Sequence, residues 1–160
     1  MMMRILMVCM GNICRSPLAE GVVRCLADRA GLGAFLEVDS AGTLAYHAGE
    51  QPDPRARKVA TSRGYDLSKM RARRVAEDDF SHFDLVLAMD RQNLAALERV
   101  CPEEHLHKLR LFMDYAEDRE LDEIPDPYYG GPDGFERVLD LCEAAARGLI
   151  ASIAGRKGGR

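Results

Sequence analysis

The chain has 160 residues, of which 47% are hydrophobic and 30% are charged, and its net charge is −4. This size and composition predict one globular domain with its own core, and they exclude a disordered chain or a membrane span. Five cysteines are too few, and odd in number, for a secreted disulfide scaffold, so we expect reduced thiols in a cytoplasmic protein. We expect the domain to cover residues 1–154 and the polar residues 155–160 to form a flexible tail.

Short apolar runs alternate with helical patterns along the chain. Apolar periodicity and capping residues predict, in order, a strand over 4–9, a helix over 16–29, a strand over 35–40, a helix over 55–63, a strand over 83–89, a helix over 91–100, a strand over 108–113 and a helix over 132–153. Strands that alternate with helices form a parallel sheet covered on both faces. In such α/β folds, ligands bind beyond the C-terminal ends of the strands.

The loop between the first strand and the first helix is typical of a small-anion site. A strand-to-helix turn directs backbone N–H groups and the positive end of the helix dipole to one point. Gly11 and Asn12 readily accept left-handed backbone angles, which lets successive amides converge. The loop lacks the Gly-Lys-Ser/Thr of a nucleotide-binding loop, so we expect it to bind a single phosphoryl group.

A cysteine enters this loop and an arginine leaves it. The spacing places the thiol of Cys9 at the bottom of the loop and lets Arg15 bind two phosphoryl oxygens. The helix terminus and Arg15 favour a thiolate, so we predict that Cys9 attacks phosphorus and that Ser16 donates a hydrogen bond to its sulfur. An ordinary buried cysteine is the alternative. The predicted phosphate-binding residues are Met10, Gly11, Asn12, Ile13, Cys14, Arg15 and Ser16.

The segment from Val8 to Ser16, VCMGNICRS, closely resembles the signature of the low-molecular-weight protein tyrosine phosphatases. Further segments match in the family's order: DSAGT at 39–43, PDPR at 52–55, FDLVLAMD at 83–90 and DPYYG at 126–130. The resemblance implies a single-domain, three-layer α/β fold with a four-stranded parallel sheet. It also implies hydrolysis of phosphotyrosine in a protein substrate through a phosphocysteine, with no cofactor and no metal.

The resemblance assigns roles outside the loop. The family's general acid sits in an Asp-Pro-Tyr context, which points to Asp126, and nearby acidic residues would favour its protonated form. Without the resemblance, a turn aspartate between prolines is the simpler interpretation. Aromatic residues at the positions of Tyr46 and Tyr128 would flank the substrate ring, and we include the adjacent Tyr129. Ser40 is expected to support the loop together with Asn12 and Ser16.

Three positions refine this interpretation. Ile13 lacks the hydroxyl of the threonine that related arginine phosphatases carry, which favours phosphotyrosine. Cys14 could form a reversible disulfide with Cys9. Met70 replaces a histidine that bacterial relatives often have, which puts in doubt the hydrogen-bond network linking Asn12, Ser16 and Ser40.

Other functions fit less well. Thioredoxin-linked arsenate reductases share the fold and loop but need two further cysteines close together after the third strand, where this chain has only Cys101. A module that only binds phosphoproteins would not need Cys9, Arg15 and Asp126 together. The basic segment 53–74 lacks interleaved aromatic residues apart from Tyr65, so we expect it to form a solvated helix face or to border an anionic substrate site rather than bind nucleic acid. We expect a monomer or weak dimer without membrane insertion.

Overall fold

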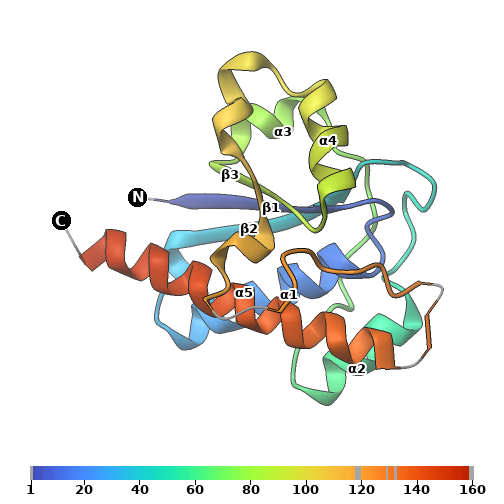
Figure 1. Cartoon of the computed structure of the whole chain (residues 1–160). Helices are drawn as coiled ribbons and strands as arrows, with labels where there is room; N and C mark the ends of the chain where they lie inside the picture. The colour runs from blue at the N-terminus through green and yellow to red at the C-terminus, as the bar shows by residue number, and fades with distance from the viewer. Residues whose placement is uncertain (1, 118–119, 129, 132, 159–160) are drawn as a thin grey trace.

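The computed structural model describes residues 2–117, 120–128, 130–131 and 133–158 (Figure 1). Its strands are β1 (Met3–Cys9), β2 (Leu36–Gly42), β3 (Leu85–Ala88) and β4 (Leu109–Leu111). They form one parallel sheet in the order β2-β1-β3-β4. The predicted α/β fold with a four-stranded parallel sheet is therefore confirmed.

Helices cover both faces of the sheet, as Figure 1 shows. The α-helices are α1 (Arg15–Arg29), α2 (Pro54–Ser62), α3 (Glu77–His82), α4 (Arg91–Val100) and α5 (Asp133–Gly158). Helices α1, α2 and α5 lie on one face, and α3 and α4 on the other. None of the described helices has the length and apolar character needed to cross a membrane.

The central strand β1 has two buried faces because its apolar run is continuous. Ile5 and Met7 belong to the core under α1 and α5, whereas Leu6 and Val8 belong to the core under α3 and α4. All four side chains are fully buried. A strand that packs on both faces needs apolar residues at every position, which explains why this segment lacks the alternation of a half-exposed strand.

The structure differs from the predicted elements at several boundaries. Helix α3 was not predicted because its six residues, EDDFSH, are too short and too acidic to show a helical period. The predicted strand over 108–113 ends at Leu111, where a 3₁₀ helix, Phe112–Tyr115, begins. Helix α5 continues past Ile153 to Gly158, because no proline interrupts it and extending an existing helix costs little. The flexibility expected of residues 155–160 stays a prediction.

The ends of the strands bring three loops together. Cys9 pairs with Gly42 and Val8 with Ala88, so β1, β2 and β3 end at the same edge of the sheet.

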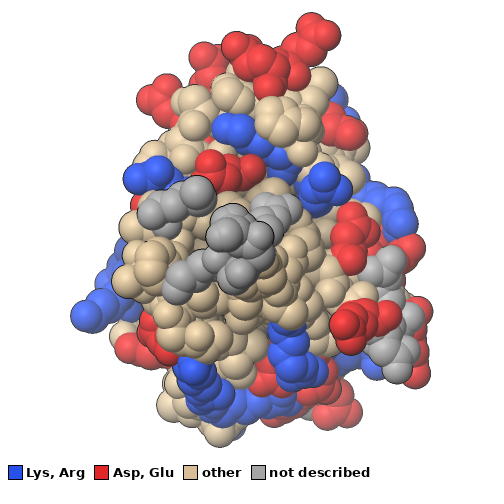
Figure 2. Space-filling view, turned by 90° about the vertical axis from the view of Figure 1, so that its left-hand side faces the viewer, with Lys and Arg blue, Asp and Glu red and all other residues tan. Residues whose placement is uncertain are grey.

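The face that carries the chain termini lies away from this edge (Figure 2). There, acidic side chains gather at the top, over the layer that holds α3 and α4, and basic side chains are scattered below. The edge at the strand ends is therefore where the predicted site should be sought.

Candidate active site

The β1–α1 loop closes tightly around the sulfur of Cys9. Asn12 has a φ of 59°, the only positive φ of a non-glycine residue in the described part of the chain. This left-handed turn directs the Asn12 N–H to Cys9 Sγ, at 3.3 Å, and Ser16 Oγ lies 3.0 Å from the same sulfur. Both contacts match the predicted arrangement, in which hydrogen-bond donors surround the thiol.

A chain of hydrogen bonds holds the loop from behind. The Asn12 side-chain amide donates to Ser16 Oγ at 2.8 Å and to Ser40 Oγ at 3.0 Å. Its carbonyl oxygen accepts from the backbone N–H of Arg73 at 3.0 Å, and Ser40 Oγ donates to Glu20 Oε1 at 2.7 Å. Asn12, Ser16, Ser40 and Glu20 are all buried. The three predicted supporting residues are therefore joined in one network.

The network linking Asn12, Ser16 and Ser40, which Met70 had put in doubt, is formed in the structure. The backbone N–H of Arg73 donates to the carbonyl oxygen of Asn12, and the carboxylate of Glu20 on α1 accepts a hydrogen bond from the hydroxyl of Ser40. Met70 instead packs against the apolar core. The network is complete without a polar side chain at position 70, because its outer partners are Glu20 and the backbone N–H of Arg73.

Arg15 is a buried cation held in a fixed orientation. Its side chain is 3% exposed, and one terminal nitrogen, Nη1, donates to Asp90 Oδ2 at 2.7 Å and to the Ile124 carbonyl at 2.9 Å. The other oxygen of Asp90 accepts the backbone N–H of Asn93 and caps α4. Burial acts to lower the pKa of Arg15, but Cys9 and the Asp90 carboxylate raise it above its ordinary value. The guanidinium therefore stays charged.

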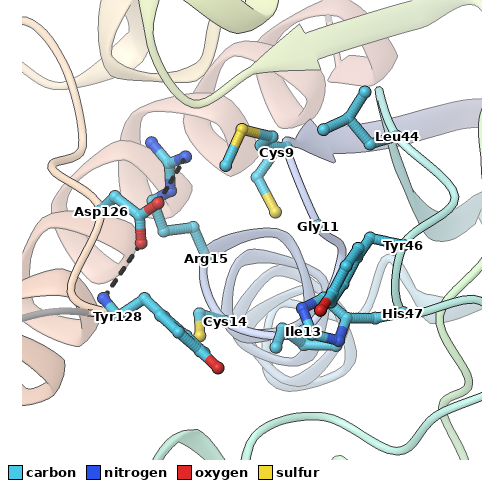
Figure 3. Close-up of a pocket in the computed structure, with 11 residues that line it drawn as sticks. Cys9, Gly11, Ile13, Cys14, Arg15, Leu44, Tyr46, His47, Asp126 and Tyr128 are labelled. Carbon is cyan, nitrogen blue, oxygen red and sulfur yellow. Dashed lines mark hydrogen bonds and ion pairs between the residues drawn. The ribbon is translucent and has the colours of Figure 1, made fainter.

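Asp126 faces Arg15 across the pocket (Figure 3). Its Oδ2 lies 3.8 Å from Arg15 Nη2, and its Oδ1 accepts the backbone N–H of Tyr128 at 3.0 Å. The carboxylates of Asp122 and Glu123, which were expected to favour a proton on Asp126, pair with Arg91 instead.

A pocket of about 410 Å³ opens above the loop. Its floor is formed by loop residues 9–11 and 13–15, and its rim by four side chains: Leu44, Tyr46, His47 and Tyr128. Figure 3 shows Tyr46 and Tyr128 on opposite sides of the opening. Tyr46 is 83% exposed. Of the predicted loop residues, Met10, Gly11, Ile13, Cys14 and Arg15 line the pocket, whereas Asn12 and Ser16 lie behind it; Tyr129 lies outside the described residues.

Comparison with known proteins decides the family. Residues 4–157 match the family model described as low molecular weight phosphotyrosine protein phosphatase. The chain belongs to this family. It is 47% identical over 161 residues to a low molecular weight protein-tyrosine-phosphatase of Streptomyces coelicolor, covering 98% of this chain and 97% of that protein. A putative member from Synechocystis is 46% identical over 152 residues, with 94% and 96% covered.

Solved structures support the same conclusion. The crystal structure of a protein tyrosine phosphatase from Entamoeba histolytica with Hepes in the active site superimposes with a TM-score of 0.93 at 43% identity. The match covers 97% of this chain and 99% of that one. The chain is thus a protein-tyrosine phosphatase, a hydrolase.

Two side chains beside the pocket of the phosphatase, His47 and Arg55, were not expected there from the sequence. His47 lies edge-on to Tyr46 with ring centroids 4.7 Å apart and packs beside Gly11. Arg55 lies over the Tyr128 ring at 5.3 Å and donates to the Tyr128 carbonyl at 3.2 Å. The only early signal was the position of His47 next to Tyr46, because the other contacts join residues far apart in the chain.

The cysteines of the phosphatase separate by environment. Burial, followed by the charge of Asp53, raises the pKa of Cys14 far above its ordinary value, so its thiol keeps its proton. Burial also raises the pKa of Cys142, a residue of α5 that packs in the hydrophobic core. Cys25 is on α1 and Cys101 follows α4, so neither forms a cysteine pair after β3. A disulfide between Cys9 and Cys14 stays a prediction.

Proposed function

We propose that this phosphatase hydrolyses phosphotyrosine in two displacements, with Cys9 as nucleophile, Arg15 as phosphoryl ligand and Asp126 as general acid. The observation that carries the proposal is the shared pocket of these three residues. The sulfur of Cys9 receives hydrogen bonds from Asn12 N at 3.3 Å and lies 3.0 Å from Ser16 Oγ. Both groups stabilise a negative sulfur, which is the reactive form of cysteine.

In the first step, the Cys9 thiolate attacks phosphorus and the bond from phosphorus to the tyrosine oxygen breaks. Asp126 gives its proton to that oxygen, so that tyrosine leaves as a neutral phenol. Arg15 and the N–H groups of the loop bind the phosphoryl oxygens, on which charge is spread in the transition state. No side chain caps the start of α1 within the described residues, which leaves the N–H groups of its first turn for the phosphoryl group.

In the second step, water attacks the phosphocysteine. Asp126, now a carboxylate, accepts a proton from the water, and the bond from phosphorus to sulfur breaks. Cys9 leaves as a thiolate, stabilised by Ser16 and Asn12, and inorganic phosphate is released. The bound phosphoryl group itself brings negative charge beside Asp126, which favours the proton that the first step requires.

The rim supports an aryl substrate. Tyr46 and Tyr128 offer apolar faces on opposite sides of the opening, and a phenyl ring binds through such area and stacking. Ile13 lines the pocket with an aliphatic side chain that offers no hydroxyl. We therefore propose phosphotyrosine rather than phosphoarginine as the substrate. Faster turnover of a phosphoarginine peptide than of the matched phosphotyrosine peptide would contradict this choice.

The role of Asp126 is tested by the dependence of the rate on the leaving group. Asp126→Asn should lower kcat/KM on a phosphotyrosine peptide by about 10²–10⁴-fold, the usual size of general acid catalysis. The loss should be much smaller on p-nitrophenyl phosphate, whose phenolate leaves without a proton. Asp122→Asn is the matched control, because Asp122 pairs with Arg91 and should leave both rates unchanged. An equal loss on both substrates would remove Asp126 from this role.

The intermediate is tested directly. Quenching with acid during turnover and digesting the protein should give a phosphorylated peptide that contains Cys9, and Cys9→Ser should give none. Because Asp126 assists the second step, Asp126→Asn should increase the trapped fraction on p-nitrophenyl phosphate. A phosphate-free peptide under these conditions would exclude the covalent route.

A further inference from the structure

A second groove adjoins the active-site pocket at Leu44. This groove has a volume of about 490 Å³ and runs between segment 74–77 and the C-terminal half of α4. Leu44 lines both the groove and the pocket, and its side chain is 49% exposed. In Figure 3, Leu44 stands at the edge of the pocket opposite Tyr128. A chain that leaves the pocket on the Leu44 side therefore enters the groove.

One wall of the groove is attached to the phosphate-binding loop. Arg74 forms an isolated bridge with Gly42 at the end of β2, and the Val75 N–H donates to the Gly42 carbonyl at 2.8 Å. The backbone N–H of Arg73 donates to the side-chain oxygen of Asn12 in the loop. On the other side, the Leu44 N–H donates to the Met10 carbonyl at 3.0 Å. The position of the groove relative to the catalytic sulfur is thus set by backbone hydrogen bonds.

The lining of the groove combines an apolar base with positive charge. Phe80 and Leu97 are fully buried at its base, and Val100 is exposed at its edge. Two of its residues are exposed arginines, Arg74 and Arg99, against one acid, Glu77. Within the described part of the chain, neither guanidinium has a carboxylate oxygen within 4.0 Å. Both cations remain available to an external anion.

We propose that this groove binds the substrate segment next to the phosphotyrosine and selects an acidic side chain through Arg74 and Arg99. The proposal rests on the proposed function, because the phosphotyrosine must occupy the first pocket. In an extended peptide, successive side chains point to opposite sides, and each residue advances the chain by about 3.3 Å. A segment that crosses Leu44 can therefore place an aspartate or glutamate at the two arginines while a neighbouring apolar side chain contacts Val100.

The test compares phosphotyrosine peptides that differ at one position. Glutamate, glutamine and lysine are placed in turn at each of the four positions before and after the phosphotyrosine, and kcat/KM is measured at low and high salt. The wild type should prefer glutamate over glutamine by about two- to fivefold at one or two neighbouring positions, the range of exposed ion pairs. This preference should shrink at high salt, because exposed charges are screened.

Variants of the two arginines separate charge recognition from a structural effect. Arg74→Ala with Arg99→Ala should abolish the preference for glutamate, and Arg74→Glu with Arg99→Glu should reverse it in favour of lysine. Arg110→Ala, at an exposed arginine of β4 outside the groove, is the matched control and should behave like the wild type. Turnover of p-nitrophenyl phosphate should be unchanged in all of these variants.

The outcomes separate the two proposals. If the wild type hydrolyses all peptides at equal rates, or if its preference for glutamate persists in the double alanine variant, the groove does not select acidic segments. The catalytic proposal would then stand. If no phosphotyrosine peptide is hydrolysed, or if Cys9→Ser keeps its activity, the proposed function itself fails.

Discussion

The floor and the rim of the active-site pocket differ in how firmly their side chains are held. On the floor and directly behind it, Arg15, Asn12 and Ser16 are buried, and their side chains make hydrogen bonds of 2.7–3.0 Å to neighbouring groups. On the rim, Tyr46 is 83% exposed and touches its neighbour His47 edge-on. A preorganised floor suits the transition state of phosphoryl transfer, whereas an exposed rim can adapt to different substrates. Substitutions should therefore act on kcat at the floor and on KM at the rim.

The largest effect should come from the nucleophile. Cys9→Ser replaces a thiolate with a neutral hydroxyl, which attacks phosphorus poorly, so kcat should fall by about 10⁴-fold or more. Binding of inorganic phosphate, measured by calorimetry, should persist because Arg15 and the loop remain. Cys142→Ser, on a cysteine of the α5 core, is the comparison for a structural thiol, and it should lower stability rather than the rate per folded molecule. Retained turnover in Cys9→Ser would break the assignment of chemistry to the floor.

The hydrogen-bonded support of the floor should give the next largest effect. Asn12→Ala leaves Ser16 and Ser40 without their donor and puts an alanine at a φ of 59°. We expect a loss of about 2–4 kcal/mol in the free energy of unfolding, measured by urea denaturation, from unsatisfied polar groups and backbone strain.

Activity of the Asn12 variants sharpens the comparison. We expect kcat of Asn12→Ala to fall by about 10²-fold, the cost of losing one preorganised donor, with a smaller change in KM. Asn12→Gly keeps the left-handed turn and should recover the part of the stability that strain removes, without recovering kcat. Wild-type kcat in Asn12→Ala would show that the chemistry does not need a rigid floor.

The rim should give a smaller effect of the opposite kind. Tyr46→Ala removes an aromatic contact worth about 0.5–1.5 kcal/mol, so KM for a phosphotyrosine peptide should rise by about two- to tenfold at nearly constant kcat. Tyr46→Phe keeps the ring and should behave like the wild type. Tyr128→Ala is to be compared with Tyr46→Ala, because Tyr128 differs from Tyr46 in its contacts with Arg55, which lies over the Tyr128 ring and donates to the Tyr128 carbonyl. A drop in kcat rather than a rise in KM for Tyr46→Ala would remove the distinction between rim and floor.

The smallest effect should be on the free energy of unfolding, through Glu20, which accepts the hydrogen bond of Ser40 behind the loop. Burial raises the pKa of Glu20 above its ordinary value of 4.5, against the hydrogen bond from Ser40 and the charge of Arg24. A carboxylate with a raised pKa contributes stability that is fully present below pH 4.5 and is lost as the pH rises through its folded pKa. Glu20→Gln removes this loss, so its free energy of unfolding relative to the wild type should increase from pH 4.5 to pH 7.

Glu37 gives a control of opposite sign for this measurement. The hydrogen bond from His82, opposed by slight burial, lowers the pKa of Glu37, so this carboxylate stabilises the fold above its ordinary pKa. Glu37→Gln should therefore lose stability relative to the wild type as the pH rises from 4 towards 6, by a small amount because the pair is exposed. The same pH trend in both variants would contradict the assignment of the Glu20 effect to burial.

The floor and the two tyrosines of the rim were predictable from sequence, whereas Leu44, His47 and the contacts made by Arg55 and Arg73 were not. The apolar run of β1, the Gly11-Asn12 turn and the start of α1 are contiguous, so local rules describe them. The contacts from Arg73 to Asn12 and from Arg55 to Tyr128 span 61 and 73 residues, and no local pattern announces them. Helix α3 was missed for the related reason that six residues cannot display a helical period. Tertiary packing, rather than propensity, determines these parts.

The double use of Asp90 restricts how this phosphatase can change. One oxygen of the Asp90 carboxylate starts α4, and the other orients the guanidinium of Arg15. A substitution of Asp90 that changes phosphate affinity by reorienting Arg15 must also remove the cap of α4. Loss of a helix cap typically costs about 1 kcal/mol of stability. Asparagine can serve the helix but cannot supply the charge, and glutamate supplies the charge with a longer side chain. Selection for weaker or tighter phosphate binding is therefore expected to act elsewhere in the pocket.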